Sequence, residues 1–247
     1  MSAKVGGRRV IELDDQDVVY EDNHLIGINK EAGDLVQGDE TGDMPLVEAL
    51  EHYLKEKYNK PFKAFVGMIH RLDRPVSGLV LFGKTSKAQV RVQKLFKDRK
   101  IIKTYIAIVR NPPPKNQDSL KHYLVRNSQK RVTYAYDTEK KSGKVAELDY
   151  ELIGQLNGYY VLRIKLITGR THQIRAQLSA IGCPIVGDNK YGYPRGGRKR
   201  TICLHGYALE FTHPVRKEQV TMRAPIPRDD FWEKFMPIFN ELDASPL

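Results

Sequence analysis

The chain has 247 residues, of which 40% are hydrophobic and 29% are charged. This composition is typical of a folded globular protein and excludes a wholly disordered one. Lys and Arg number 41 against 30 Asp and Glu, so the formal net charge is +11. Such a balance favours a polyanionic partner, most commonly nucleic acid, although a basic surface can also serve solubility alone.

Cysteine usage and hydropathy exclude further classes. The two cysteines, Cys183 and Cys203, form no CxxC pair, which argues against a disulfide scaffold and favours a reducing compartment. No stretch approaches the ~20 apolar residues that span a bilayer, and the N-terminus does not resemble a secretion signal. The chain contains no GxGxxG loop and no HExxH motif. Its one match to the GxxxxGK[ST] pattern, Gly78–Thr85, is filled by the apolar run Leu79-Val80-Leu81-Phe82, which indicates a strand and not a phosphate-binding loop. We therefore expect a cytoplasmic protein that uses no metal and no cofactor.

The N-terminal part is expected to hold a lead-in, a hairpin and a helix. Residues 1–17 are expected to be flexible, with regular structure beginning at Val18. Two short apolar runs within 18–30 flank the turn-prone Glu21-Asp22-Asn23, which predicts a hairpin or strand pair. Pro45 then begins an amphipathic helix. Its apolar residues share one stripe: Leu46, Val47, Leu50, Tyr53 and Leu54.

The middle of the chain is expected to be rich in strands. Residues 79–82 form an apolar strand, and Ser86 then caps a helix that extends to about Lys97. The residues expected to point inward from this helix are Val90, Leu95 and Phe96. A strand from Ile101 to Val109 follows, and several β-rich runs within 122–168 are separated by turn signals such as Asn157-Gly158. This pattern predicts an antiparallel meander.

The C-terminal part is expected to hold two helices. Thr171 caps a short helix that ends at Gly182 and buries Ile174, Leu178 and Ile181. A last helix around residues 231–242 is interrupted by Pro237. The simplest architecture is a single mixed α/β domain over residues 18–247, built on an extended, largely antiparallel sheet.

The first cluster that could carry chemistry is His70-Arg71-Leu72-Asp73-Arg74-Pro75. Two arginines bracket one carboxylate, and Pro75 prevents a helix at this point. Neighbouring guanidinium groups stabilise the charged form of a carboxylate. A charged carboxylate on a loop is suited to nucleophilic attack or to proton abstraction. The alternative is an ordinary surface ion pair, which contributes little and is common.

The second cluster is Thr168-Gly169-Arg170-Thr171-His172-Gln173-Ile174-Arg175. Arg170 lies just ahead of a predicted helix N-terminus, where free N–H groups attract anions. His172 and Arg175 fall about one turn apart on the polar side of that helix. The cluster is therefore either a phosphate or carboxylate site or simply a capped helix with a solvated face.

The third cluster is the Gly-rich segment 187–200, which also holds Tyr191 and Tyr193. Its basic residues are Lys190, Arg195, Arg198, Lys199 and Arg200. Cations interleaved with aromatic rings suit phosphate contact combined with base stacking. A further basic run over residues 91–103 carries six cations and one acid. Either run could be an idle solvated face, but two such runs in a basic chain favour RNA as the partner.

The segment HRLDRPVSG resembles the catalytic motif of the RluA family of pseudouridine synthases. The resemblance extends from about Val18 to Pro225, and its signals occur in the family's order. VVYEDNHLIGINKEAGDLV resembles the opening strands, Lys103-Thr104-Tyr105 resembles the segment with the active-site tyrosine, and LITGRTHQIRAQLSAIGCPIVGDNKYG resembles the third motif. After the second arginine, this chain has Pro75-Val76 where the family has an acidic or similar residue and then Thr.

The resemblance implies a fold, an activity and a set of site residues. The fold is the pseudouridine synthase fold, a mixed and largely antiparallel sheet flanked by helices with a catalytic cleft. The activity is isomerisation of uridine in ribosomal or transfer RNA, on a base flipped out of its stack. Asp73, Tyr105 and Arg170 are the implied catalytic residues. The implied RNA-binding residues, together with those of the basic clusters, are His70, Arg71, Arg74, Ile167, His172, Arg175, Lys190, Arg195, Arg198, Lys199 and Arg200.

The role of Asp73 as nucleophile or as base at the ribose stays open at this point, and so do two other functions. A glycosylase would also use a carboxylate near C1′ but would release free base. A catalytically silent RNA-binding module would need no carboxylate in its site. We expect a monomer that binds RNA without a membrane partner. Because the segment before Val18 is short, we also expect no S4-type RNA-binding domain.

Overall fold

The structure is a computed structural model that describes residues 2–5, 7–194 and 201–244. The chain divides into two compact units. One comprises Met1–Ile101 with Ala208–Pro225, and the other comprises Ile102–Tyr207 with Ile226–Leu247. The predicted mixed α/β class with a largely antiparallel sheet is confirmed. Among the described residues, no helix is both long and apolar enough to cross a membrane.

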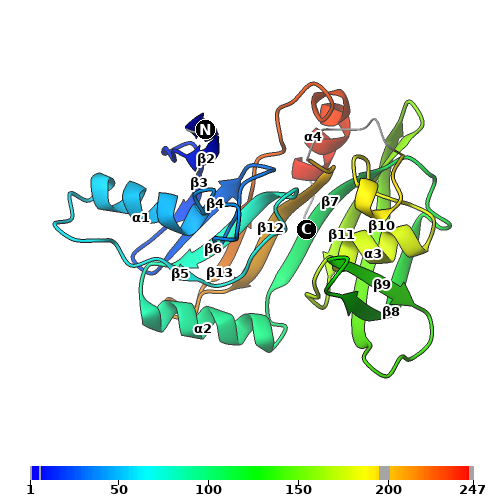
Figure 1. Cartoon of the computed structure of the whole chain (residues 1–247), viewed down its shortest axis with the longest axis horizontal. Helices are drawn as coiled ribbons and strands as arrows, with labels where there is room; N and C mark the ends of the chain where they lie inside the picture. Colours follow the sequence, from blue (N-terminus) through cyan, green and yellow to red (C-terminus); the bar gives the residue numbers. More distant parts are fainter. Residues whose placement is uncertain (1, 6, 195–200, 245–247) are drawn as a thin grey trace. The chain divides into compact units, whose positions relative to one another are not determined.

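The first unit is built on short antiparallel strands (Figure 1). The strands are β3 (Val18–Glu21), β4 (Leu25–Lys30), β5 (Gly67–Met68), β6 (Ser77–Gly83) and β13 (Gln219–Arg223), and β13 pairs with the second half of β12 (Leu204–Thr212). The pairing of β3 with β4 confirms the predicted hairpin. Strand β6 is buried along its whole length, which explains its continuous apolar sequence.

Two helices complete the first unit, α1 (Leu46–Lys57) and α2 (Ser86–Lys97). The predicted stripe of α1 is largely correct, because Leu46, Leu50 and Leu54 are buried, with Ala49 in place of Val47. In α2 the expected inward position of Val90 is wrong, since its side chain is 63% exposed. Ala88 and Val92, one turn apart, point into the core, and Val90 lies between them in sequence and so on the opposite face. The N-cap of α2 is Thr85, whose Oγ1 accepts a hydrogen bond from the Ala88 amide at 3.2 Å.

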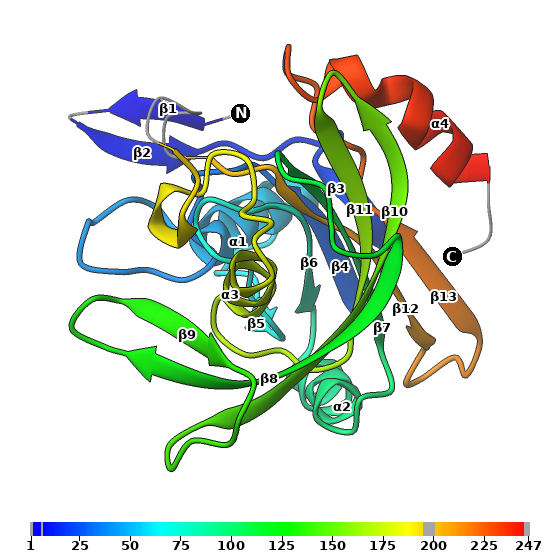
Figure 2. The ribbon, with the colours of Figure 1, turned by 90° about the vertical axis from the view of Figure 1, so that its right-hand side faces the viewer.

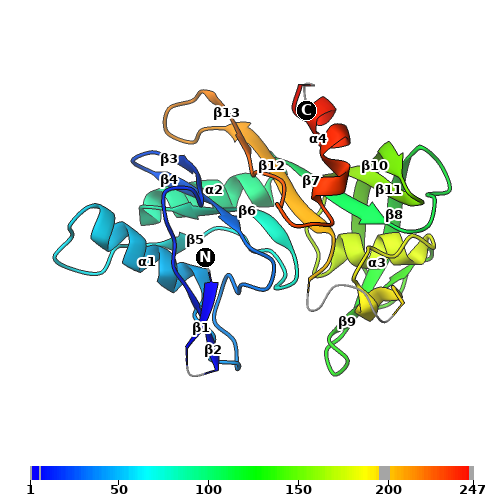
Figure 3. The ribbon, with the colours of Figure 1, turned by 90° about the horizontal axis from the view of Figure 1, so that it is seen from above.

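Regular structure begins before Val18, contrary to prediction. Strands β1 (Ser2–Val5) and β2 (Arg8–Ile11) form a separate antiparallel pair, which stands apart from β3 and β4 in Figure 3. The Arg9 amide donates to the Asp43 carboxylate at 2.8 Å, and the Arg9 carbonyl accepts from the Met44 amide at 2.9 Å. Strand β2 is therefore held by a loop more than thirty residues away, a contact that no local sequence pattern signals.

The second unit contains the predicted meander. Its strands are ordered β7-β11-β10-β8-β9, all antiparallel: β7 (Ile102–Val109), β11 (Tyr159–Leu166), β10 (Lys144–Leu156), β8 (Gln117–Asn127) and β9 (Val132–Tyr136). Asn157 and Gly158 connect β10 to β11 with φ values of 53° and 72°. These left-handed conformations are the ones that an Asn-Gly hairpin turn requires.

The described residues of the second unit also form helices (Figure 2): α3 (Gln173–Ala180), which packs on β8 and β9, and α4 (Met236–Ala244), which directly follows a 3₁₀ turn (Glu233–Phe235). A second 3₁₀ turn spans Asn189–Tyr191. Pro237 lies in the first turn of α4 and therefore begins this helix instead of interrupting it. Helix α4 packs closely on β10, because a β-carbon at Gly154 would lie 2.7 Å from the Ile238 side chain.

Candidate active site

Asp73 lies on the loop between β5 and β6 in the first unit. The Val76 amide donates to the Asp73 carbonyl at 3.0 Å and closes a turn. Leu72 and Val76, 6% and 2% exposed, anchor the loop on both sides, while Asp73 is half-buried and Arg71 is exposed. The loop thus presents a carboxylate from a backbone that is fixed by buried apolar neighbours.

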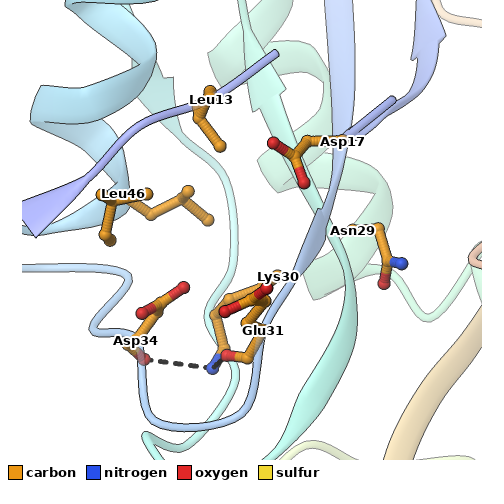
Figure 4. Close-up of a pocket in the computed structure, with 8 residues that line it drawn as sticks. Leu13, Asp17, Asn29, Lys30, Glu31, Asp34 and Leu46 are labelled. Carbon is orange, nitrogen blue, oxygen red and sulfur yellow. Dashed lines mark hydrogen bonds between the residues drawn. The ribbon is translucent and has the colours of Figure 1, made fainter. Parts of the chain in front are cut away.

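Lys30 is a buried cation beneath this loop that the sequence motifs did not single out. It ends β4 opposite Gly78 of β6 and is 1% exposed. Its Nζ donates to the carbonyls of Glu31, Asp34 and Arg74 at 2.8, 3.0 and 3.3 Å. Figure 4 shows the Lys30 ammonium directed at the Asp34 carbonyl. Because Arg74 follows Asp73 directly, Lys30 fixes the backbone beside the candidate catalytic carboxylate.

Burial dominates the electrostatics around Lys30. Desolvation lowers the pKa of Lys30 to about 7, against a smaller raising effect of nearby Asp34. Burial also raises the pKa of the Asp34 carboxyl, although Arg9 and Lys30 oppose this shift. A cavity of about 10 Å³ adjoins the two side chains, which is room for roughly one water molecule. Its lining residues are Ile11, Leu13, Asp17, Asn29, Lys30, Glu31, Asp34 and Leu46.

Arg74 is held by the loop that follows β4. Its Nε donates to the Gly33 carbonyl at 3.0 Å, and the Gly33 amide returns a bond to the Arg74 carbonyl at 2.7 Å. Its guanidinium also forms an ion pair with Asp43, and Arg9 pairs with Asp34 in the same network. The structure therefore shows a holding role for Arg74 within the loop, and its predicted contact with RNA stays a prediction.

His70 also braces this loop. Its Nε2 accepts a hydrogen bond from the Leu81 amide of β6 at 3.0 Å, so its proton is on Nδ1 when the ring is neutral. The imidazole stacks on Phe96 of α2 with ring centroids 4.8 Å apart. Both contacts connect the start of the motif to the core of the unit.

Tyr105 and Ile167 belong to the second unit. Tyr105 is half-buried on β7 and pairs with Ile164 of β11. Ile167, also half-buried, follows β11, and its amide donates to the Glu147 carbonyl at 3.2 Å. The start of β7 lies beside the loop of Arg170, because a β-carbon at Gly169 would lie 3.8 Å from Lys103 Nζ.

The loop that carries Arg170 is ordered by Gln173. The Gln173 Oε1 accepts from the Arg170 amide at 3.0 Å and from Thr168 Oγ1 at 2.7 Å. The predicted capping role of Thr171 is wrong, because His172 occupies the N-cap in a left-handed conformation with φ of 55°. The Gln173 side chain instead accepts the hydrogen bonds of the loop. Arg170 is exposed, and its Nε donates to the Val145 carbonyl at 3.2 Å.

His172 and Arg175 connect α3 to its surroundings. His172 Nδ1 lies 2.7 Å from Tyr191 Oη, which accepts from the Thr133 amide at 2.8 Å. Burial raises the pKa of Tyr191, so its hydroxyl keeps its proton. These bonds hold β9 to the beginning of α3.

The predicted polar position of Arg175 is wrong. Its side chain is buried and forms a bidentate ion pair with Asp188 at 2.7 and 2.9 Å, and its guanidinium lies 4.9 Å from the centroid of the Tyr191 ring. Asp188 is 1% exposed. A partner thirteen residues downstream thus turns a helix position that a local pattern assigns to the surface into a core position.

The third basic cluster is only partly visible. Arg195, Arg198, Lys199 and Arg200 lie outside the described residues. Lys190 is exposed, and its Nζ donates to the Arg131 carbonyl at 3.5 Å. Across the described ranges, no group of three or more His, Cys, Asp or Glu side chains is arranged to hold a metal ion.

Comparisons with solved structures support the fold. The chain resembles human RNA pseudouridylate synthase domain containing 4, with a TM-score of 0.74 and 21% identity over 91% of this chain and 93% of that one. It also resembles human RNA pseudouridylate synthase domain containing 1, with a TM-score of 0.70 and 23% identity over 96% and 99% of the two chains. The predicted pseudouridine synthase fold is confirmed.

Sequence comparisons identify the family. The chain is 31% identical over 212 residues to ribosomal large subunit pseudouridine synthase C of Rickettsia prowazekii, covering 85% of this chain and 68% of the relative. It is 34% identical over 228 residues to ribosomal large subunit pseudouridine synthase D of Yersinia pestis, covering 86% and 68%. The sequence profile of the family described as RNA pseudouridylate synthase matches residues 24–180, which include Asp73, Tyr105 and Arg170. The chain belongs to the RNA pseudouridylate synthase family and, within it, to the RluA family that its motifs resemble.

Proposed function

We propose that this enzyme converts uridines of large-subunit ribosomal RNA to pseudouridine, with Asp73 as the carboxylate that acts on the ribose. The observation that carries the proposal is the setting of Asp73. The carboxylate is half-exposed on a loop closed by the Val76 amide and fixed from below by Lys30. The loop lies inside the segment that the family profile matches.

The reaction is an isomerisation in which atoms balance without a co-reactant. The N1–C1′ bond of uridine breaks, the uracil turns, and a C5–C1′ bond forms. N1 gains a proton and C5 loses one. The uridine must leave its stack to undergo these steps, so the enzyme acts on a flipped-out nucleotide. Asp73 acts at the ribose, either as the nucleophile at C1′ or as a base.

Other residues support the chemistry in the proposed mechanism. Arg71, which is exposed beside Asp73, holds the flipped-out strand by contact with phosphate. Tyr105 lies against the uracil ring and assists removal of the C5 proton, and Ile167 packs on the base. Arg170 is the third catalytic residue of the proposal, and its guanidinium offsets the desolvation that closing a base over a carboxylate causes.

Large-subunit ribosomal RNA is the proposed substrate because two similar proteins carry that substrate in their names. With this substrate, we expect the enzyme to act in the cytoplasm. Residues 18–247 act in the proposal as the catalytic domain that supplies the affinity for RNA, in a monomer. Size-exclusion chromatography with light scattering tests the last point, and a dimer mass would contradict it.

The test of the function is a map of pseudouridines in total cellular RNA from cells with and without the active protein. We expect one or a few positions in large-subunit ribosomal RNA to lose pseudouridine when the protein is absent. If pseudouridine is lost only from transfer RNA, the proposed activity is correct but the proposed substrate is wrong. Abasic sites in RNA incubated with the protein would indicate a glycosylase. An unchanged map together with tight RNA binding would indicate a silent binding module.

A further inference from the structure

The second unit also contains a groove that is lined in part by the β8–β9 hairpin. It has a volume of about 420 Å³, within the range of small-ligand sites. Its lining comes from β8, β9, the start of β10 and the loop before α3. The lining residues are Leu124, Val125, Arg126, Thr133, Ser142, Lys144, Gly169, Arg170 and Thr171. We call this feature the hairpin groove.

The chemistry of the hairpin groove suits an anion. Three of its nine lining residues, Arg126, Lys144 and Arg170, are cations, and Thr133, Ser142 and Thr171 add hydroxyl groups. None of the described lining residues is an Asp or Glu. The groove therefore combines positive charge with many hydrogen-bond donors, which is the combination that phosphate oxygens accept.

Strand register explains how Arg126 and Lys144, which lie on different strands, come close together. Arg126 lies opposite Thr133 of β9, and Lys144 lies opposite Leu124 of β8. Because Leu124 and Arg126 are two residues apart, they share one face of β8, and Lys144 is the diagonal neighbour of Arg126 on that face. Diagonal neighbours are about 7 Å apart, within reach of one ligand for long side chains.

These cations are available to a ligand. Across the described residues, Arg126 and Lys144 form no ion pair with a carboxylate. Arg126 Nη1 makes a long bond of 3.4 Å to Thr171 Oγ1. Arg170 donates through Nε to the Val145 carbonyl, which fixes it next to Lys144 on β10. The cations thus keep terminal donors that a phosphate can occupy.

The walls of the groove are held in place by buried contacts. The amide of Thr133, on the β9 wall, donates to Tyr191 Oη, which also bonds to His172 at the beginning of α3. Next to the lining residue Gly169, Thr168 Oγ1 accepts a hydrogen bond from the Glu147 amide of β10 at 2.9 Å. A groove with such walls exists before the ligand arrives, so binding does not have to order it.

We propose that the hairpin groove binds the phosphodiester backbone of the substrate RNA through Arg126 and Lys144. The inference rests on the proposed function, which gives Arg170 a place beside the reacting uridine. Since Arg170 also lines the groove, a strand that leaves the flipped uridine reaches Arg126 and Lys144 next. These contacts are to phosphate, so they add affinity for RNA of any sequence and do not select the uridine.

The experiment compares the double variant Arg126→Gln/Lys144→Gln with a matched double variant, Lys121→Gln/Lys165→Gln. Both remove two cations from strands of the same unit. Lys121 and Lys165 are exposed and lie outside the groove lining. Dissociation constants for transcribed large-subunit ribosomal RNA are measured by filter binding from 50 to 300 mM KCl, and single-turnover rates at saturating RNA are measured in parallel.

We expect the groove variant to bind about 10-fold more weakly at 100 mM KCl, with a salt slope reduced by about 1.5, since each lost phosphate contact removes about 0.7–0.9 from it. Its single-turnover rate at saturation should stay within about threefold of wild type, and the matched variant should change both quantities much less. Equal weakening in both variants would mean that only net charge matters and would overturn the proposal. Unchanged binding, or a rate loss without weaker binding, would overturn it as well.

The proposed function and this inference fail in different ways. If the wild-type protein forms no pseudouridine, the proposed function fails, while the salt slopes of the two variants still report whether the groove contacts RNA. If the wild-type protein forms pseudouridine and the groove variant binds RNA as tightly as wild type, only the groove assignment fails.

Discussion

Lys30→Met removes the buried cation beneath the Asp73 loop and keeps a side chain of similar length. In the folded protein, desolvation lowers the pKa of Lys30 from its ordinary value of 10.5 to about 7. In the unfolded chain the ammonium is solvated and keeps its ordinary pKa. Between about pH 7 and pH 10.5, the unfolded state therefore binds more protons at this position than the folded state does.

The sign and size of the effect follow from this difference. Folding stability rises with pH wherever the unfolded state binds more protons. A pKa depressed from 10.5 to about 7 corresponds to about 5 kcal/mol over the whole window, of which about 2 kcal/mol falls between pH 7 and pH 9. Wild-type protein gains this contribution as pH rises, and the Met variant does not.

The Met variant also loses three hydrogen bonds to the carbonyls of Glu31, Asp34 and Arg74. Each bond contributes about 1 kcal/mol, and the carbonyls are left without this donor. Near pH 7 this loss is offset, because the Met variant does not have to bury an ammonium group. We therefore expect Lys30→Met to be only modestly less stable than wild type at pH 7 and clearly less stable at pH 9.

The assay is urea denaturation of wild type and Lys30→Met at half-unit steps from pH 6 to pH 9.5. The quantity of interest is the difference in unfolding free energy, because groups that titrate equally in both proteins cancel. Lys87→Met, a change at an exposed lysine of α2, serves as control and should give a flat difference. A flat difference for Lys30→Met would refute the argument that burial depresses this pKa.

Three further predictions concern the second unit and the cofactor requirement. Asp188→Asn leaves buried Arg175 without the Asp188 carboxylate, so the free energy of unfolding, measured by thermal or urea denaturation, should fall by about 3–5 kcal/mol. An unchanged midpoint would contradict a buried ion pair. Arg170→Ala should lower the single-turnover rate about 100-fold, the scale of removing one electrostatic contact to the reacting groups, with partial recovery in Arg170→Lys; a wild-type rate would remove Arg170 from the mechanism. Activity should persist after exhaustive chelation, with RNA folding checked separately, and restoration by zinc or magnesium of a lost rate would contradict cofactor-free isomerisation.

Local sequence patterns predicted the elements whose signals are local. The Asn157-Gly158 turn, the apolar strand that became β6 and the stripe of α1 are all in place. The apolar pattern gave the wrong answer in α2, where two different helix faces both carry apolar residues. Val90 is as apolar as Val92, but only one of the two can share a helix face with Ala88.

Contacts between distant segments were beyond such patterns. Strand β2 is held through Arg9 by Asp34 and Asp43, and neither partner is apolar or close in sequence. Arg175 is buried because Asp188 neutralises it. A charged residue on a helix ordinarily indicates a solvated face, so only the tertiary partner reveals the opposite position.

In the candidate site, too, some residues could be found from the sequence and others only from the structure. The resemblance at HRLDRPVSG singled out Asp73 and its flanking arginines, while Lys30 was hidden at the end of a strand. Arg126 and Lys144 come together through the register of β8 and β10. Since they are separated by eighteen residues and belong to no motif, the sequence alone gives no reason to connect them.

The central claim is that the Asp73 carboxylate performs the chemistry, and Asp73→Asn tests it most directly. The amide keeps the size of the side chain and removes its charge. The measurement is single-turnover formation of pseudouridine in transcribed large-subunit ribosomal RNA, with RNA affinity and the unfolding midpoint measured on the same preparation. We expect no detectable pseudouridine from a variant that folds and binds RNA as wild type does. Pseudouridine formed by Asp73→Asn at a rate near that of wild type would contradict the claim.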